Sequence, residues 1–313
     1  MFSHSASMIT RLTLLFALLL PAAAYAQSVD NIETLRERSL ALVNEERSAR
    51  GLGTLQLEEN LNEAALAHAQ DMLERRYFAH TSPEGENVLD RFLEAGGEDG
   101  RVVRENLSNC EGCRERPDIA AVEQMHEGWM DSPGHRANIL AEGLNGFGFA
   151  VVQDDNGRRY GVQTFAGPGM PRGEAPDGSV ELLEPEAQTE LAASIINDMR
   201  SGADTVQADG RLRRHVESKL PADDLAGVGL GDIGVLQEIP GDFPWLRYQV
   251  LSGQCGGCGE VPTNSDVHFF FDNWEKNARS RKILEDGAFK DIGFAIAADG
   301  EGRKIGVLLL AGE

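Results

Sequence analysis

Two histidines and a glutamate carry side chains that could do chemistry together. His80 lies in the stretch 77–85, Glu105 begins a Glu-Asn-Leu triplet, and His135 lies in a Trp-x-x-Ser-Pro-Gly-His-Arg-x-Asn-Ile-Leu run. If folding brings them together, two neutral imidazoles and a carboxylate can hold Zn²⁺ at about 2.0–2.2 Å and leave one position for water. Such a water becomes nucleophilic near neutral pH, with Glu105 or Asp131 as the candidate general base.

A structural role for the same histidines is the alternative. His80 precedes Thr-Ser-Pro and His135 follows Pro-Gly, so both could be loop histidines that hydrogen-bond backbone groups and orient two turns. His68 and His126 are expected on the exposed sides of predicted helices, without a role in chemistry. The residues alone leave the cation site and the pair of loop histidines both open.

Helices and a short sheet must position these residues. Apolar periodicity predicts a helix that ends at Gly51, a second that starts at Asn60 with a capping-box-like Glu63, a third before a Gly-Gly pair, and a fourth opened by Pro117. These helices cover residues 32–50, 60–77, 88–95 and the stretch after 117. Two strands, 146–153 and 158–165, flank the hairpin sequence Asp-Asp-Asn-Gly. The pattern predicts an α+β fold with helices on a short antiparallel sheet.

With these three stretches the sequence resembles the CAP superfamily, the cysteine-rich secretory, antigen 5 and pathogenesis-related proteins that carry an SCP domain. It is most similar to the short secreted members from bacteria. The Trp-x-x-Ser-Pro-Gly-His-Arg run is the most specific part of the resemblance, and the Glu-Asn-Leu triplet alone would be weak. The resemblance implies an α-β-α sandwich with a cleft that binds zinc or another divalent cation in some members.

Carried over residue by residue, the resemblance implies metal ligands at His80, His135 and Glu105. Several animal relatives place a further glutamate where this chain has Ser132. Asp131 directly before it and Glu127 further back are the possible additional acids, so the resemblance does not supply a complete set of two histidines and two acids.

The sequence repeats itself at an offset of 145 residues. The repeat relates a Cys-x-x-Cys pair, a tryptophan and a Gly-Phe-Ala strand segment, which are Cys110, Cys113, Trp129 and 148–150 in the first copy and Cys255, Cys258, Trp274 and 293–295 in the second. At the same offset Ser280 replaces His135 and Val250 replaces Glu105. We therefore predict two tandem CAP-like sandwich domains, of which the second is degenerate and lacks the polar cluster.

The four cysteines are expected to form two local disulfides, Cys110 with Cys113 and Cys255 with Cys258. A zinc ribbon would need its second pair some 15 to 20 residues after the first, and a redox dithiol would need a helix beginning at its first cysteine. Each disulfide would shape the loop before a tryptophan-bearing helix more than stabilise the domain, because so short a loop restricts the unfolded chain little.

The chain is predicted to be exported. A positive flank, a short apolar core and an Ala-Tyr-Ala site indicate a signal peptide over residues 1–26, cleaved near Ala26, which leads to a secreted or periplasmic location. The predicted domains are 27–167 and 185–313, joined by a Pro- and Gly-rich linker at 168–184. No segment of the mature chain is expected to span a membrane.

Charge and composition restrict the partners. The chain has 313 residues, 51 Asp and Glu against 29 Lys and Arg, and a formal net charge of −22. Nucleic acid is excluded as the main partner, because its backbone would be repelled. The expected function is a binding module in the cell envelope or outside the cell, with a divalent-cation cleft in the first domain and an unidentified ligand or envelope component as partner. The alternative is a metal-dependent hydrolase that acts on peptide or cell-wall material through the same cleft.

Overall fold

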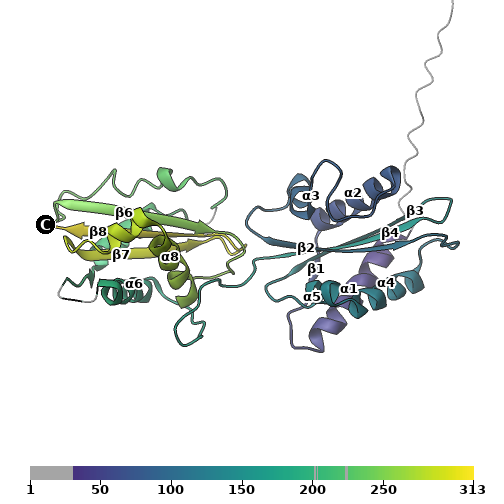
Figure 1. Ribbon diagram of the computed structural model, residues 1–313, viewed down its shortest axis with the longest axis horizontal. Helices are drawn as coiled ribbons and strands as arrows, with labels where there is room; N and C mark the ends of the chain where they lie inside the picture. The colour runs from purple at the N-terminus through teal and green to yellow at the C-terminus, as the bar shows by residue number, and fades with distance from the viewer. Residues whose placement is uncertain (1–30, 201, 203, 223–224) are drawn as a thin grey trace, which may run out of the picture.

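The computed structural model describes residues 31–200, 202, 204–222 and 225–313, which form two halves, each built on a four-stranded sheet (Figure 1). The predicted signal peptide, residues 1–26, lies outside the described residues. None of the described helices has the length and apolar character needed to cross a membrane.

The first half alternates helices and strands in the order α1, β1, α2, α3, β2, α4, α5, β3, β4. The helices are α1 (Ile32–Ser48), α2 (Glu59–Arg75), α3 (Val88–Glu94), α4 (Ile119–Asp131) and α5 (Pro133–Ile139). The strands are β1 (Gln56–Leu57), β2 (Val102–Cys110), β3 (Gly146–Gln153) and β4 (Arg159–Gly167), in the sheet order β1-β3-β4-β2.

Strand β3 shows why helices cover both faces of this sheet. Its alternating side chains point to opposite faces, and both sets are buried. Phe147 and Phe149 belong to a core shared with α1, α4 and α5, whereas Ala150 and Val152 belong to a core shared with α2. The α-β-α arrangement is thus confirmed, with α2 and α3 on one face and α1, α4 and α5 on the other (Figure 1).

Several local predictions differ from the structure. The sheet is not purely antiparallel, because the two-residue β1 pairs in parallel with β3. Helix α2 begins at Glu59, and Asn60 lies within its first turn with its side chain bonded to the Leu61 amide, so Asn60 does not cap the helix. An additional helix, α5, begins at Pro133, because proline is well suited to a first helical position.

The second half repeats this order of elements, except that a short 3₁₀ helix lies where the first half has α3. Its helices are α6 (Pro185–Arg200), α7 (Gly210–Lys219), α8 (Asn264–Lys276), α9 (Ala278–Leu284) and the short 3₁₀ helix η1 (Leu230–Asp232). Its strands are β5 (Gln207–Ala208), β6 (Arg247–Cys255), β7 (Phe289–Ala298) and β8 (Lys304–Gly312), in the order β5-β7-β8-β6. The bounds of β6, α8 and β8 lie 145 residues after those of β2, α4 and β4, at the offset found in the sequence.

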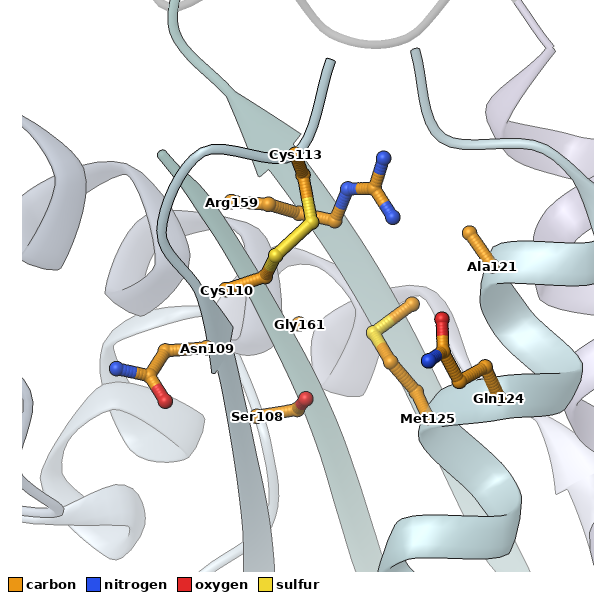
Figure 2. A pocket seen from close by; sticks show the side chains of 9 residues that line it. All are labelled: Ser108, Asn109, Cys110, Cys113, Ala121, Gln124, Met125, Arg159 and Gly161. Atoms are coloured by element: carbon orange, nitrogen blue, oxygen red, sulfur yellow. A yellow bond between two sulfur atoms is a disulfide. The ribbon is translucent and has the colours of Figure 1, made fainter. Parts of the chain in front are cut away.

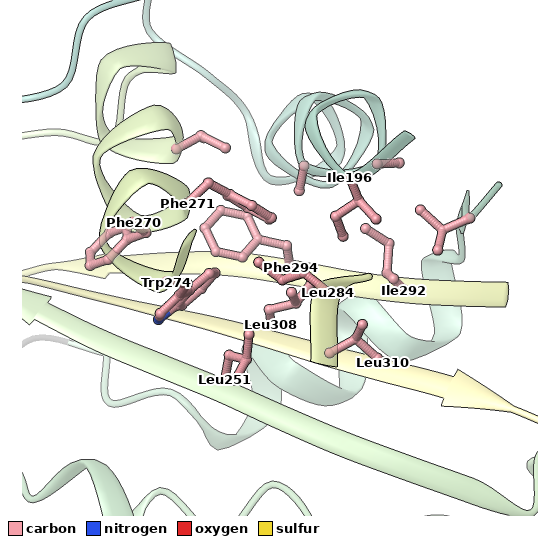
Figure 3. Close-up of a cluster of buried hydrophobic side chains, with 14 of the residues drawn as sticks. Ile196, Leu251, Phe270, Phe271, Trp274, Leu284, Ile292, Phe294, Leu308 and Leu310 are labelled. Atoms are coloured by element: carbon pink, nitrogen blue, oxygen red, sulfur yellow. The ribbon is translucent and has the colours of Figure 1, made fainter. Parts of the chain in front are cut away.

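A buried aromatic cluster holds the second sheet against its helices (Figure 3). Trp274 on α8 packs edge-on against Phe271 and Phe294, and Phe270 stacks beside it. Trp129 on α4 takes the equivalent place in the first half, where it packs edge-on against Phe149. The two tryptophans therefore anchor equivalent helices, α4 and α8, each against the sheet of its own half.

The two halves touch where the segment after α3 meets the loop after β6. The amide of Gly257 donates to the carbonyl of Gly100 at 2.6 Å, and Arg303 forms an ion pair with Asp99 at 2.6 Å. Residues 168–184, which join the halves, form no helix and none of the strands of the two sheets. Gly169 within this segment pairs with Cys258 in an isolated β-bridge.

Candidate functional site

His80 and Glu105 are in direct contact. Glu105 lies on β2 with its side chain 2% exposed, while His80 lies in the loop between α2 and α3 with its side chain 60% exposed. His80 Nδ1 is 2.8 Å from Glu105 Oε1. Because an ionised carboxylate only accepts hydrogen bonds, Nδ1–H donates. The other ring nitrogen, Nε2, has no hydrogen-bond partner among the described residues, and it belongs to a ring that is largely exposed to solvent.

The second oxygen of Glu105 binds a buried arginine. Arg91 on α3 donates from Nη2 to Glu105 Oε2 at 2.9 Å, and its side chain is 5% exposed. The same guanidinium donates to the carbonyls of His80 and Glu86 at 3.0 and 3.1 Å. Arg91 therefore holds both the carboxylate and the loop that carries His80.

The charges around His80 favour its protonated form. The hydrogen bond to Glu105 raises the pKa of His80, and the negative charge of that carboxylate acts in the same direction. Partial burial and the charge of Arg91 oppose the shift. The result is an imidazole oriented by a buried carboxylate, in which the proton on Nε2 is the one exchanged with solvent.

His68 is part of this arrangement, contrary to the prediction that it faces solvent. It lies on α2, is 1% exposed, and its Nε2 is 2.9 Å from the carbonyl of Ala79 and 3.9 Å from Glu105 Oε1. Burial is the main cause that lowers the pKa of His68, so the ring is held neutral and Nε2–H donates to Ala79. His68 thus fixes the loop one residue before His80.

His135 lies on helix α5 rather than in a loop, so the loop-histidine interpretation is wrong for this residue. Its pKa is lowered by partial burial and by the neighbouring charge of His80. Amide side chains tie α5 to β2: Asn138 donates to the carbonyl of Glu105 at 3.0 Å, and Asn106 donates to the carbonyl of His135 at 3.2 Å. These two asparagines place His135 beside the strand that carries Glu105.

The comparisons with known proteins agree with the motifs. Residues 40–165 match the family model described as "CAP: Cysteine-rich secretory protein family". Residues 40–165 form a CAP domain. The relatives include the uncharacterized protein YkwD of Bacillus subtilis strain 168, 29% identical over 39% of this chain and 44% of that protein. They also include the uncharacterized membrane protein YlbC of the same strain, 33% identical over 47% of this chain and 39% of that protein.

Among solved structures, an extracellular SCP-domain protein from Bacillus anthracis strain Ames matches at 26% identity with a TM-score of 0.36. The match covers 42% of this chain and 40% of that one. This chain also spans less than half the length of the two curated Bacillus subtilis relatives, YkwD and YlbC.

In the CAP domain, Glu105 is in a poor position to bind a metal directly. Both of its oxygens are engaged, one by His80 and the other by the buried Arg91. Among the described residues, no group of three or more His, Cys, Asp or Glu side chains is placed to hold a metal ion. Glu105 instead orients His80, as carboxylates commonly do for metal-binding histidines.

The two additional acids proposed for the CAP domain, Glu127 and Asp131, lie exposed on α4. Neither makes a hydrogen bond or ion pair with His80, His135 or Glu105 among the described residues. His126 on the same helix is buried instead of exposed, and burial lowers its pKa. Its Nδ1 has no hydrogen-bond partner in the described part of the chain.

Both predicted disulfides are present. Cys110 is bonded to Cys113 and Cys255 to Cys258, with Cα atoms 6.1 and 6.2 Å apart. Each disulfide follows the strand that carries the site position, β2 in the CAP domain and β6 in the second half.

The second half places different residues at the positions of the CAP-domain site. Val250 is the fourth residue of β6, as Glu105 is of β2, and Ser280 is the third residue of α9, as His135 is of α5. Between α7 and β6 the described residues of the second half form the three-residue 3₁₀ helix η1 and no α-helix like α3, which supplies Arg91 in the CAP domain.

Proposed function

We propose that this protein is a secreted CAP-domain protein whose first half binds a divalent cation through His80 and His135, and that it acts as a binding module in the cell envelope or outside the cell. The observation that carries this proposal is the 2.8 Å hydrogen bond from His80 Nδ1 to the buried Glu105, which makes Nε2 the atom that would give up its proton and bind the cation. Zinc is among the cations that imidazole ligands suit and is the one we test.

The supporting argument concerns how a metal-binding histidine is prepared. A histidine that binds a metal through one nitrogen usually donates its other N–H to a carboxylate, which fixes the tautomer and the orientation of the ring. Glu105 does this for His80, and Arg91 fixes Glu105 in turn. His135 beside them would be the second ligand, and its lowered pKa keeps its imidazole neutral, the form that binds metal.

A hydrolase is the second candidate, and the same pair favours it. A carboxylate that orients a histidine is also the arrangement of a general base, with His80 Nε2 as the atom that would take a proton. We place binding ahead of turnover because no nucleophilic side chain contacts His80 Nε2 among the described residues. Peptide and cell-wall fragments are the substrate classes to test.

The remainder of the proposal concerns location and the second half. The predicted signal peptide supports export to the periplasm or the medium. The shared order of elements and the offset of 145 residues support a degenerate CAP copy over 185–313, for which we propose a role in interaction or shielding.

Calorimetric titration of the chelator-treated protein with zinc tests the cation site. We expect saturable binding near one equivalent. His80→Asn tests the site most directly. The asparagine amide N–H can replace Nδ1–H as the donor to Glu105, but asparagine has no counterpart of Nε2. Zinc binding should therefore be lost while the fold is kept. His268→Asn in the second half is the matched control and should bind zinc like the wild type. Equal binding by the His80→Asn variant, or no binding by the wild type, would overturn the site.

Glu105→Gln separates the two roles of the carboxylate. If Glu105 only orients His80, zinc binding should weaken by about 10- to 100-fold and persist. Complete loss of binding by a folded variant would instead make Glu105 a direct ligand. Incubation with peptides and cell-wall fragments, with His80→Asn as the control, decides whether the site also catalyses cleavage.

A further inference from the structure

A cavity lies at the end of β2 away from Glu105, between α4 and the strands (Figure 2). Its volume is about 340 Å³, and one wall is the Cys110–Cys113 disulfide. None of its lining residues belongs to the site around His80. The other lining residues come from β2, α4 and β4 and are Ser108, Asn109, Ala121, Gln124, Met125, Arg159 and Gly161.

Arg159 brings a buried positive charge to this cavity. The residue is 8% exposed. Its guanidinium donates to the Gln153 side-chain oxygen at 2.7 Å and to the carbonyl of Glu115 at 2.6 Å. No carboxylate lies within ion-pair distance of Arg159 among the described residues, and the side chains of Asp118 and Glu115 act on it only from further away. A guanidinium so deeply buried normally has an anionic partner.

The second half shows which side chain pairs with a buried cation at the strand position equivalent to Arg159. Lys304 pairs with Cys255 across β8 and β6, as Arg159 pairs with Cys110 across β4 and β2. Lys304 Nζ binds Asp266 Oδ2 at 2.6 Å, and the two side chains are 0% and 1% exposed. Asp266 is the third residue of α8, and the third residue of α4 is Ala121, which lines the cavity. The first half thus keeps the cation and lacks the carboxylate.

The apolar side chain that the helix places over the strands also differs between the halves. In the second half Phe270 is 1% exposed and lies against Gly253 and Gly306. The equivalent residue on α4 is Met125, whose slimmer, flexible side chain adapts to ligands of different shape. Figure 2 shows Met125 and Gln124 projecting from α4 beside the cavity, with the Arg159 guanidinium at its disulfide end.

We propose that this cavity binds a small monocarboxylate with an apolar body. The ligand carboxylate would pair with Arg159, in the place where Asp266 pairs with Lys304, and its apolar body would lie against Met125 and Ala121. The strongly negative net charge of the chain repels anions in general, so uptake of a carboxylate would report this cavity and not the surface. The proposal concerns a site separate from His80 and stands whether or not zinc binds there.

Calorimetry with 3-phenylpropionate as the probe tests the proposal on the unmodified full chain. 3-Phenylpropionamide is the matched neutral probe, because it has the same apolar body without the charge. We expect the carboxylate to bind at least tenfold more tightly than the amide, and His80→Asn to leave that binding unchanged. Equal affinity for the two probes, or no binding of the carboxylate at millimolar concentration, would overturn the proposal.

Ala121→Asp places an internal carboxylate where the ligand would bind. We expect this variant to lose 3-phenylpropionate binding by at least tenfold, whereas Ala121→Ser keeps it within about threefold. If Ala121→Asp does not fold, the pair Ala121→Asp with Arg159→Lys copies the Lys304–Asp266 arrangement and should fold without binding the probe. Unchanged binding in either aspartate variant would refute the assignment of Arg159 as the carboxylate partner.

Discussion

Replacement of Arg91 by methionine should destabilise the CAP domain strongly. Methionine keeps much of the side-chain volume but removes three hydrogen bonds, two to the carbonyls of His80 and Glu86 and one to Glu105. Glu105, 2% exposed, would then be a buried carboxylate without its arginine. Loss of one partner of a buried ion pair costs about 3–5 kcal/mol. We expect about 3 kcal/mol at acidic pH, where protonated His80 still pairs with Glu105, and a larger loss at higher pH.

Urea unfolding followed by circular dichroism measures this effect, and hydrogen exchange locates it in the first half. The control is Arg38→Met, because Arg38 and Glu123 form an ion pair on the surface with side chains 37% and 41% exposed. An exposed pair of this kind contributes about 0–1 kcal/mol. If the Arg91 variant loses no more free energy of unfolding than the Arg38 variant, the idea that Arg91 holds the site together is refuted.

Three further predictions follow from other contacts. Because the folded-state pKa of His80 is raised, its stabilising contribution should be complete below pH about 6.5 and be lost as pH rises through the raised value. An NMR titration should show that pKa, and His80→Asn should remove this part of the pH dependence. Lys304→Met should cost about 3–5 kcal/mol in chemical denaturation, because it leaves Asp266 buried and unpaired, and a cost below 1 kcal/mol would contradict the pairing. Gly148→Ala should lower stability by about 1–3 kcal/mol or more, because its Cβ would lie 2.3 Å from the backbone of α2, whereas Gly134→Ala, which meets nothing within 4 Å, should change thermal stability little.

Much of the scaffold could be predicted from the sequence, because its elements carry strong local signals. Strands β3 and β4 are joined by a Gly-containing turn, and α3 is an apolar run that ends before a Gly-Gly pair. The two-residue β1 could not be predicted, because two residues show no periodicity. Helix α5 differs from the sequence prediction because Ser-Pro-Gly is typical of a turn, although proline also favours the first position of a helix.

The surroundings of the site were only partly predictable. Contact between His80 and Glu105 came from the family resemblance, and nothing in the local sequence placed Arg91 between α3 and β2. The burial of His68 does have a signal in the sequence: the residue is spaced seven residues after Leu61 and four before Met72, both buried, so it belongs to the apolar stripe of α2. A polar side chain is normally expected on the exposed face of a helix. His68 can be buried because its ring donates a hydrogen bond to the carbonyl of Ala79, which lies near it only in the folded chain.

The two halves together separate what the fold needs from what a site needs. Both keep the tryptophan-bearing helix, the disulfide and the glycine whose Cβ would strike the helix behind the sheet, Gly148 in one half and Gly293 in the other. The second half forms the same sheet with Val250 where the CAP domain has Glu105, so a buried carboxylate at this strand position is not required by the sheet. A buried ion pair is in any case a costly way to stabilise a core, since apolar residues of similar volume often do as well or better. The polar network around Glu105 is therefore better explained by what it prepares, an oriented and exposed His80, than by the stability that it gives.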